Sequence, residues 1–218
     1  MAELRTEEEQ LEALKNWWKE NGRSLIIGLV VALSAVFGWK GWQSYTERQA
    51  TEASWLYQNM VEAVVSELDE NPAPQVETIQ HLGNQLKANH AKSTYAQYAA
   101  LLLARVAVQL QDYDQALAEL DWVIEQAKED DLKRLAGLRR VRVLLAADQV
   151  DQAASALSGL SPGSFSAIYY ELQGDVAYRQ GNVGAAVEAY DRALAAAENL
   201  PTRPVLQMKR DELGSEAG

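Results

Sequence analysis

The stretch from Ser24 to Trp39 constrains this chain most, because it contains 16 consecutive residues without a charged side chain. A helix that spans a bilayer needs about 20 residues. The stretch reaches that length if Arg23 and Lys40 extend their charged ends to the headgroups, while Trp39 and Trp42 lie at the membrane interface. We therefore predict one transmembrane helix from Arg23 to Trp42.

Two other interpretations of this stretch compete with a permanent span. Ala32, Ser34 and Ala35 resemble the small-residue site that follows a cleaved signal peptide. However, the first 23 residues hold six Glu against four Lys or Arg, which is unlike the short basic start of such a peptide. A buried core helix is the second alternative, although the glycines and the lack of a polar face are unusual there. The pairs Gly28 with Ala32 and Ser34 with Gly38 have the four-residue spacing of small residues that lets a partner helix approach.

The positive charges around the span bear on its orientation. Lys15, Lys19 and Arg23 precede it, whereas Lys40 and Arg48 follow it. Positive residues are enriched on the cytoplasmic side, so this small excess favours a cytoplasmic N-terminus without deciding the orientation.

The segment before the span has a helical pattern of its own. From Glu7 to Asn21, Leu11, Leu14 and Trp18 fall on one face, and Asn21 with Gly22 predicts a C-terminal cap. The sequence thus divides into an N-terminal segment (1–22), a transmembrane helix (23–42) and a predicted helical domain (43–218).

Composition and motifs argue against catalysis and against nucleic acid binding. Residues 43–218 carry 15 Lys or Arg against 25 Asp or Glu, a net charge of −10 that repels phosphate. The chain has no cysteine, which excludes a disulfide, a thiolate zinc site and a cysteine nucleophile. It also lacks a glycine-rich phosphate loop and a nucleophile elbow. His81 and His90 are predicted to be separate surface residues, so we expect no enzyme activity, no cofactor and no metal site.

The predicted domain is helical throughout, because no segment alternates with a period of two. Long helices are expected at Thr46–Glu70 and Val76–Asn89, separated by a break over residues 71–74. Pro201 and Pro204 predict an irregular segment before a final short helix.

A repeated pattern links three later segments of the chain. Residues 110–116, 147–153 and 180–186 resemble one another, and their alanines Ala116, Ala153 and Ala186 lie 37 and 33 residues apart. This spacing is close to the 34-residue tetratricopeptide period, and the best copy runs from Ala167 to Glu198. In that copy Gly174 and Ala186 are expected where antiparallel helices touch, with Tyr170 and Tyr190 between neighbouring repeats.

The fold prediction is therefore all-α: one N-terminal transmembrane helix followed by a tetratricopeptide-like α-solenoid of antiparallel helix pairs. A generic array of α-hairpins is the alternative. Such solenoids bind peptides in the groove of their stacked helices. The predicted partner-binding residues are Tyr95, Tyr98, Arg139, Arg142 and Tyr169.

Four short motifs are spread along nearly the whole chain. They are Trp17-Trp18-Lys19-Glu20-Asn21-Gly22-Arg23 before the span, Gly38-Trp39-Lys40 with Trp42 at its far end, Ala53, Ser54, Tyr57 and Gln58 after it, and Leu206-Gln207-Met208-Lys209 with Asp211 and Leu213 near the C-terminus. Together they resemble the YfgM family, the ancillary subunits of the bacterial SecYEG translocon. In that family the motifs correspond to the approach to the membrane, the exit from it, the start of the first soluble helix and the C-terminal tail.

The resemblance implies a single-pass protein of the Gram-negative inner membrane, with a cytoplasmic N-terminus and a periplasmic repeat domain. It implies the SecYEG translocon and a PpiD-like periplasmic chaperone as partners, and newly exported proteins as clients. Two alternatives stay open: a membrane-tethered scaffold for another envelope assembly or signalling complex, and an enzyme whose active site forms only with a partner.

Overall fold

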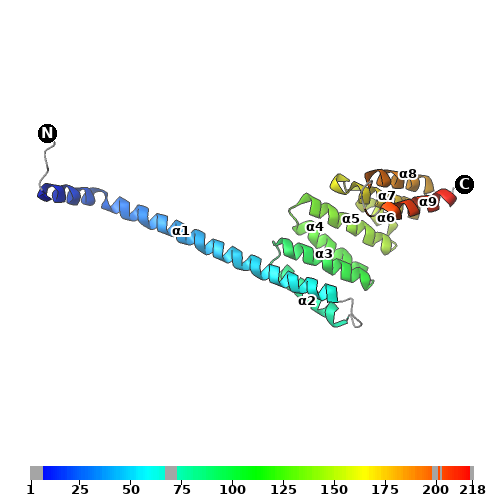
Figure 1. The fold of residues 1–218 in the computed structure, drawn as a ribbon, viewed down its shortest axis with the longest axis horizontal. Helices are drawn as coiled ribbons and strands as arrows, with labels where there is room; N and C mark the ends of the chain where they lie inside the picture. Colours follow the sequence, from blue (N-terminus) through cyan, green and yellow to red (C-terminus); the bar gives the residue numbers. More distant parts are fainter. Residues whose placement is uncertain (1–6, 67–72, 198–200, 202, 217–218) are drawn as a thin grey trace. The chain divides into compact units, whose positions relative to one another are not determined.

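The computed structural model describes residues 7–66, 73–197, 201 and 203–216, and every regular element in these ranges is a helix (Figure 1). A single 3-10 turn, η1 (Gly163–Phe165), accompanies the α-helices. The α-helices are α1 (Glu7–Ser66), α2 (Ala73–Asn89), α3 (Thr94–Gln109), α4 (Tyr113–Gln126), α5 (Asp130–Ala146), α6 (Val150–Ser158), α7 (Ser166–Arg179), α8 (Val183–Ala196) and α9 (Arg203–Glu216).

The chain falls into two compact units, residues 1–51 and 52–218. The first unit contains most of α1, and the second, called the helical domain below, contains the end of α1 and the helices α2 to α9. Each unit is described by itself.

The first unit contains the one helix of the described residues that is long and apolar enough to cross a membrane. None of its apolar window is buried, and Phe37 and Trp39 are 69% and 65% exposed. A core helix of a globular protein would be covered, so the buried-helix alternative is wrong. The aromatic pair Trp39 and Trp42 lies with ring centroids 5.7 Å apart.

The predicted break at Asn21 and Gly22 is wrong, because α1 continues through both residues. The side-chain amide nitrogen of Asn21 donates a hydrogen bond to the backbone carbonyl of Trp17, one turn earlier, and does not cap a helix end. Gly22 is buried beneath the Trp18 indole. A glycine inside a helix costs about 1 kcal/mol, which a helix of 60 residues tolerates.

The predicted break near Pro72 separates α1 from α2, with a different boundary. α2 begins at Ala73, so Pro74 lies in its first turn, where its missing N–H would have no partner within the helix. Pro204 has the same place in α9. The predicted ends of the Thr46–Glu70 helix and of the Ala167–Glu198 copy lie outside the described residues.

The three similar segments form three identical helix-to-helix turns. Gln111, Asp148 and Gly181 adopt positive φ angles of 60°, 61° and 77° at the ends of α3, α5 and α7. In the first turn, the N–H of Asp112 donates to the carbonyl of Ala107 at 2.8 Å, and the N–H of Gln111 donates to Val108 at 3.0 Å. The other two turns repeat this Schellman pattern of hydrogen bonds.

A side-chain cap starts the following helix in two of the three turns. Asp112 accepts a hydrogen bond from the N–H of Gln115, and Asn182 accepts one from the N–H of Ala185, both at 3.1 Å. Gln149 occupies this position in the remaining turn and makes no cap. A C-terminal left-handed turn followed at once by an N-cap explains why these short segments resemble one another.

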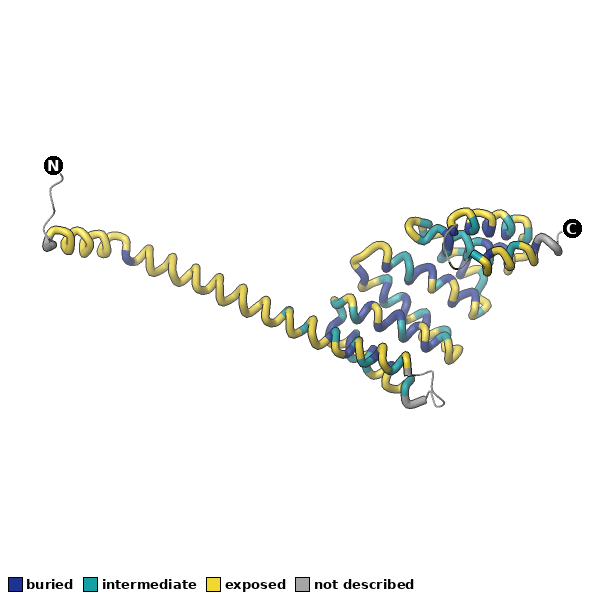
Figure 2. The backbone as a smooth tube through the Cα atoms, viewed as in Figure 1, coloured by how far each residue is buried: buried dark blue, intermediate teal, exposed yellow. Residues whose placement is uncertain are grey.

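Buried residues recur along successive helices of the helical domain (Figure 2). Ala116, Ala153 and Ala186 are each 0% exposed, as the close packing of repeat helices requires. One cluster joins α1, α2 and α3, a second joins α3, α4 and α5, and a third joins α5, α6 and α7. The helix contacts thus link neighbours along the chain, as the predicted solenoid of antiparallel pairs requires.

Gly174 provides the closest approach in the last repeat. A Cβ atom at this position would lie 2.5 Å from Cε1 of Tyr190, so no larger residue fits without movement. Tyr190 therefore packs within its own helix pair, and it also joins Leu213 of α9 in one cluster. Tyr170 contacts a cluster that includes Ala193 and Leu206, between the repeat and α9.

Candidate functional site

A groove of about 300 Å³ lies between α3 and α5 and has a largely apolar floor. Residues of α3 and α5 recur at spacings of three and four, which places them on the face of each helix that borders the groove. The residues that line this α3–α5 groove are Leu101, Ala104, Arg105, Val108, Gln109, Leu120, Arg139, Arg142, Val143 and Ala146.

Arg105 and Arg139 are the only arginines in the described part of the helical domain that lack a carboxylate or carbonyl partner within the domain. Both border the α3–α5 groove, and both are exposed. Every other described arginine of this domain has such a partner: Arg134 with Asp131, Arg140 with Asp121, Arg142 with Glu171, Arg179 with Asp148, Arg192 with Glu188, Arg210 with Asp191, and Arg203 with the carbonyl of Leu194.

The surroundings of Arg139 disfavour its charge. Desolvation by the neighbouring protein lowers the pKa of the Arg139 guanidinium, and the positive charge of Arg142 lowers it further. Arg142 itself lies 3.4 Å from a carboxylate oxygen of Glu171. A negative group placed in the α3–α5 groove would raise the pKa of Arg139 again and so offset both effects.

The predicted partner-binding residues do not form one site. Arg139 and Arg142 meet in the α3–α5 groove, whereas Tyr95 and Tyr98 lie against Tyr57 of α1, with ring centroids 5.6 and 6.3 Å from it. Tyr95 is partly buried against the core there, and its predicted role in partner binding stays a prediction.

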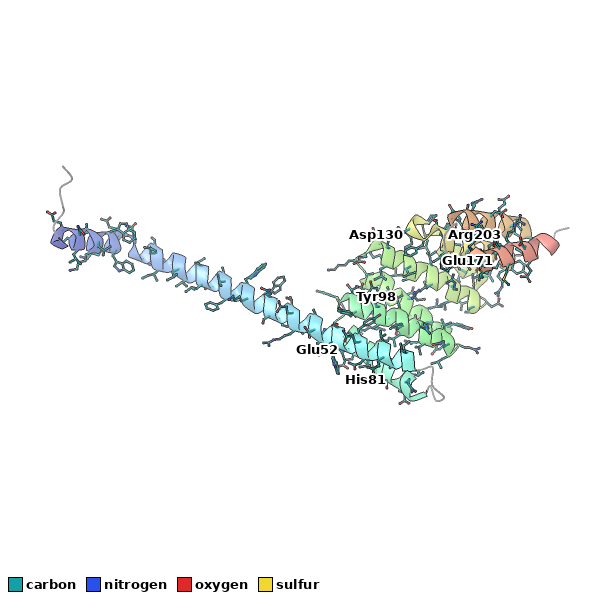
Figure 3. All side chains as sticks on the ribbon, in the orientation of Figure 1. Glu52, His81, Tyr98, Asp130, Glu171 and Arg203 are labelled. Atoms are coloured by element: carbon teal, nitrogen blue, oxygen red, sulfur yellow. The ribbon has the colours of Figure 1, made fainter. Side chains whose placement is uncertain are left out.

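Tyr98 is 40% exposed, and Figure 3 labels it on α3. Leu101 and Arg105 follow Tyr98 by three and seven residues, so the three side chains share one face of α3.

Tyr169 belongs to a different depression, which has a volume of about 340 Å³ and lies between α6, α7 and α8. Its ring is partly buried against the third core cluster and lies edge-on to Tyr170, with centroids 5.5 Å apart. The walls of this depression are as polar as they are apolar, with Gln173, Asn182, Glu188 and Arg192 among them.

A charged network joins the C-terminal helix to α7 and reaches the α3–α5 groove. The ammonium of Lys209 contacts Glu171 at 2.9 Å and Asp175 at 2.8 Å, and Glu171 also faces Arg142 (Figure 3 labels Glu171). Burial lowers the pKa of Lys209, but its hydrogen bonds to the two carboxylates reverse this and raise the pKa overall. Burial and a 2.7 Å hydrogen bond to Asp175 raise the pKa of Tyr190.

Sequence reasoning missed two features of the charged residues. Glu119 is 1% exposed and forms an ion pair with Lys87 at 2.6 Å. Its position between Ala116, Leu120 and Val123 on the buried face of α4 was a signal, because a carboxylate there requires a partner. Arg105, which completes the α3–α5 groove, stands alone in an apolar stretch of α3.

His81 is exposed, as predicted, but His90 is buried with 7% exposure, so its predicted surface position is wrong. His90 lies in the turn between α2 and α3, where the N–H of Ser93 donates to its carbonyl at 2.8 Å, and its Nε2 lies 3.8 Å from Glu52. Within the described residues, no group of three or more His, Cys, Asp or Glu is arranged to hold a metal ion.

The comparison with protein families agrees with this architecture. A family model for a tetratricopeptide repeat-like domain matches residues 15–215. Among solved structures, a chain named MamA RS-1 ArsTM double mutant aligns with 78% of this chain and 96% of its own length, with a TM-score of 0.48 and 15% identity.

Curated relatives carry a single name, ancillary SecYEG translocon subunit. The protein from Haemophilus influenzae is 30% identical over 95% of this chain and 97% of its own length. The protein from Escherichia coli is 30% identical over 95% and 96%, and the one from Neisseria gonorrhoeae is 31% identical over 98% and 100%. The chain described here therefore belongs to the ancillary SecYEG translocon subunit family, with a tetratricopeptide repeat-like domain.

Proposed function

We propose that this chain is a membrane-tethered, non-catalytic subunit of the SecYEG translocon. The observation that carries the proposal is the identity of about 30% to relatives of that name over nearly their whole lengths. The architecture agrees, because a stack of helix pairs with an open groove is suited to binding proteins, and the apolar part of α1 is suited to a membrane anchor.

The proposed topology has residues 1–22 in the cytoplasm, a span over 23–42 and residues 43–218 in the periplasm of a Gram-negative cell. Two features support the span, namely the unburied apolar window of α1 and the flanking Arg23 and Lys40. The positive residues before the span favour a cytoplasmic N-terminus.

The proposed role is to help a PpiD-like periplasmic chaperone to receive newly exported proteins. A helical domain that offers a groove but no catalytic constellation among its described residues is suited to docking. The arrangement requires that two proteins bind at once, one through the anchor in the membrane and one through the helical domain.

Affinity purification of the tagged full-length protein from membranes in mild detergent tests the translocon assignment. The matched control replaces residues 24–39 by leucine, which keeps a span but removes its small-residue pattern. We expect translocon subunits and a periplasmic chaperone with the natural chain, and a loss of translocon subunits with the control. Consistent recovery of another envelope complex, with no translocon subunit, would identify a scaffold of that complex instead.

The absence of cysteine from the chain makes its topology directly measurable. Ala13→Cys places a thiol before the span, and Ser161→Cys places one at an exposed position of the helical domain. In cells with a permeabilised outer membrane, an impermeant maleimide should label Ser161→Cys but not Ala13→Cys. The opposite labelling would show that the orientation is inverted.

A further inference from the structure

We propose that the α3–α5 groove binds a peptide segment of a partner protein in which apolar side chains alternate with carboxylates. The segment would place an apolar side chain on the floor of the groove and carboxylates beside Arg105 and Arg139. This inference rests on the proposed function and names the chemistry of what its docking surface binds.

The floor of the groove sets the apolar requirement. Leu101, Val108 and Val143 contribute apolar side chains, and Ala104 and Ala146 are too small to fill the space between α3 and α5. An apolar side chain from a partner would fill that space and release the water from it, at about 25 cal/mol for each Å² of apolar surface removed from water.

The two unpartnered arginines set the charge requirement. Residues 43–218 hold ten more acidic than basic residues. Every other described arginine of the helical domain has a carboxylate or carbonyl partner, whereas Arg105 and Arg139 have neither among the described residues. An arginine offers a planar fork of donors that matches a carboxylate, and the match is strongest where water is partly excluded. The direction of the shift, a pKa lowered by desolvation and by the charge of Arg142, is consistent with a guanidinium that lacks a counter-ion.

Because the domain has a net negative charge, the two arginines can favour an acidic segment only at short range. An acidic segment is repelled at long range, so binding depends on contacts within about one Debye length, roughly 8 Å at physiological salt. A segment with both acidic and apolar side chains covers the apolar floor and pairs with both arginines. A purely acidic segment leaves the floor exposed to water, and a basic segment is repelled by both arginines.

A selection from a library of synthetic peptides tests the chemistry. The bait is the full-length protein in detergent, and the peptides are randomised over leucine, phenylalanine, glutamate, glutamine, lysine and serine. We expect the bound peptides to be enriched in glutamate next to leucine or phenylalanine. We also expect their affinity to fall about tenfold in Arg105→Gln and again in Arg139→Gln.

Arg140→Gln is the matched control, because Arg140 is on the same helix as Arg139 but pairs with Asp121 and does not line the groove. Its bound peptides should equal those of the natural chain. The inference is overturned if bound peptides are basic or uncharged, or if the variant with both Arg105→Gln and Arg139→Gln selects the same peptides. Circular dichroism of each variant checks that its helices are intact.

A photo-crosslinker at Gln109, an exposed residue of the groove, identifies the occupant in membranes. We expect a crosslink to an acidic and apolar segment of a different polypeptide, mapped by mass spectrometry. A crosslink to another copy of this chain, to its own C-terminal helix or to lipid overturns the inference. The two proposals can fail separately. If translocon subunits co-purify with the protein but the peptides are not selected as expected, the proposed function holds and this inference fails. If the peptides are selected as expected but no translocon subunit co-purifies, this inference holds and the proposed function fails.

Discussion

The ammonium nitrogen of Lys87 on α2 lies 2.6 Å from a carboxylate oxygen of Glu119 on α4, a residue with only 1% exposure. The side chain of Gln115 donates a 2.7 Å hydrogen bond to the other carboxylate oxygen, and the Trp122 ring lies 5.4 Å from the ammonium. This ion pair joins the first helix pair of the domain to the second, across the buried face of α3.

We expect Lys87→Met to destabilise the helical domain by about 3–5 kcal/mol, because it leaves the Glu119 carboxylate buried and unpaired. Replacing both residues, Lys87→Met with Glu119→Leu, should recover much of this loss, since no charge is then buried. Urea unfolding followed by circular dichroism measures both effects. Lys92→Met, at an exposed position, is the control, and an equal shift in that variant would contradict the role of the pair.

Gly174→Ala should destabilise the last repeat by about 1–3 kcal/mol, because the new methyl group would overlap the Tyr190 ring. Gly184→Ala is the matched control, since a Cβ at this helical position would meet nothing within 4 Å. Alanine favours the helix there, so the control should stabilise by up to about 1 kcal/mol. Thermal unfolding of the two variants should therefore shift in opposite directions, and parallel shifts would refute the contact.

The left-handed turns predict a stabilising substitution. Gln111 adopts a positive φ angle, which costs a non-glycine residue about 1–2 kcal/mol. Gln111→Gly removes this cost but raises the conformational entropy of the unfolded chain, so it should stabilise the domain by up to about 1 kcal/mol. Gly181→Ala, at the equivalent turn, should destabilise it by a similar amount. Midpoints of urea unfolding measure both, and a loss of stability in Gln111→Gly would mean that its side chain makes a contact of greater value.

The stability of the domain should fall as the pH rises above about 10. The folded state raises the pKa of Lys209 above its ordinary value of 10.5, and that of Tyr190 above 10.0. A raised pKa stabilises the protonated form, so the contribution is complete below the unfolded value and is lost as the pH passes the folded value. Urea midpoints between about pH 8 and 12 should fall more steeply for the natural chain than for Lys209→Met, and equal slopes would exclude Lys209 as a cause.

The repeats were predictable from sequence because local rules and packing agree there. The polar turn around Asp148 and the alanine five residues later are set by backbone geometry and by the close approach of two helices, so they recur at a nearly fixed spacing. The end of a helix at Asn21 and Gly22 was not predictable in the same way. A glycine permits a break but does not require one, and here the helix continues.

The candidate site was predictable only in part. Arg139 and Arg142 stand out as a basic cluster in an acidic domain. Arg105 is 34 residues from Arg139, and only the packing of α3 and α5 against α4 brings the two arginines to one groove. Tyr95 and Tyr98 are three residues apart, and the sequence gives no sign that one faces the core and the other the solvent. Arg140 with Asp121 and Arg179 with Asp148 pair through tertiary contacts that no spacing encodes. Arg134 with Asp131 and Arg192 with Glu188 are instead pairs about one helical turn apart on the same helix.

The stacking of each helix on its neighbours along the chain has a consequence for how the domain opens. A solenoid has no single hydrophobic core on which all its helices depend, so the free energy of opening any part is a sum of contributions from neighbouring helices. The last helix, α9, is held through Leu206, Leu213 and the Lys209 network, and its release leaves the α3–α5 groove intact. Amide protons should therefore exchange with solvent at graded rates, fastest in α9 and slowest in α3 to α5. The C-terminal helix can open locally while the α3–α5 groove keeps its bound segment.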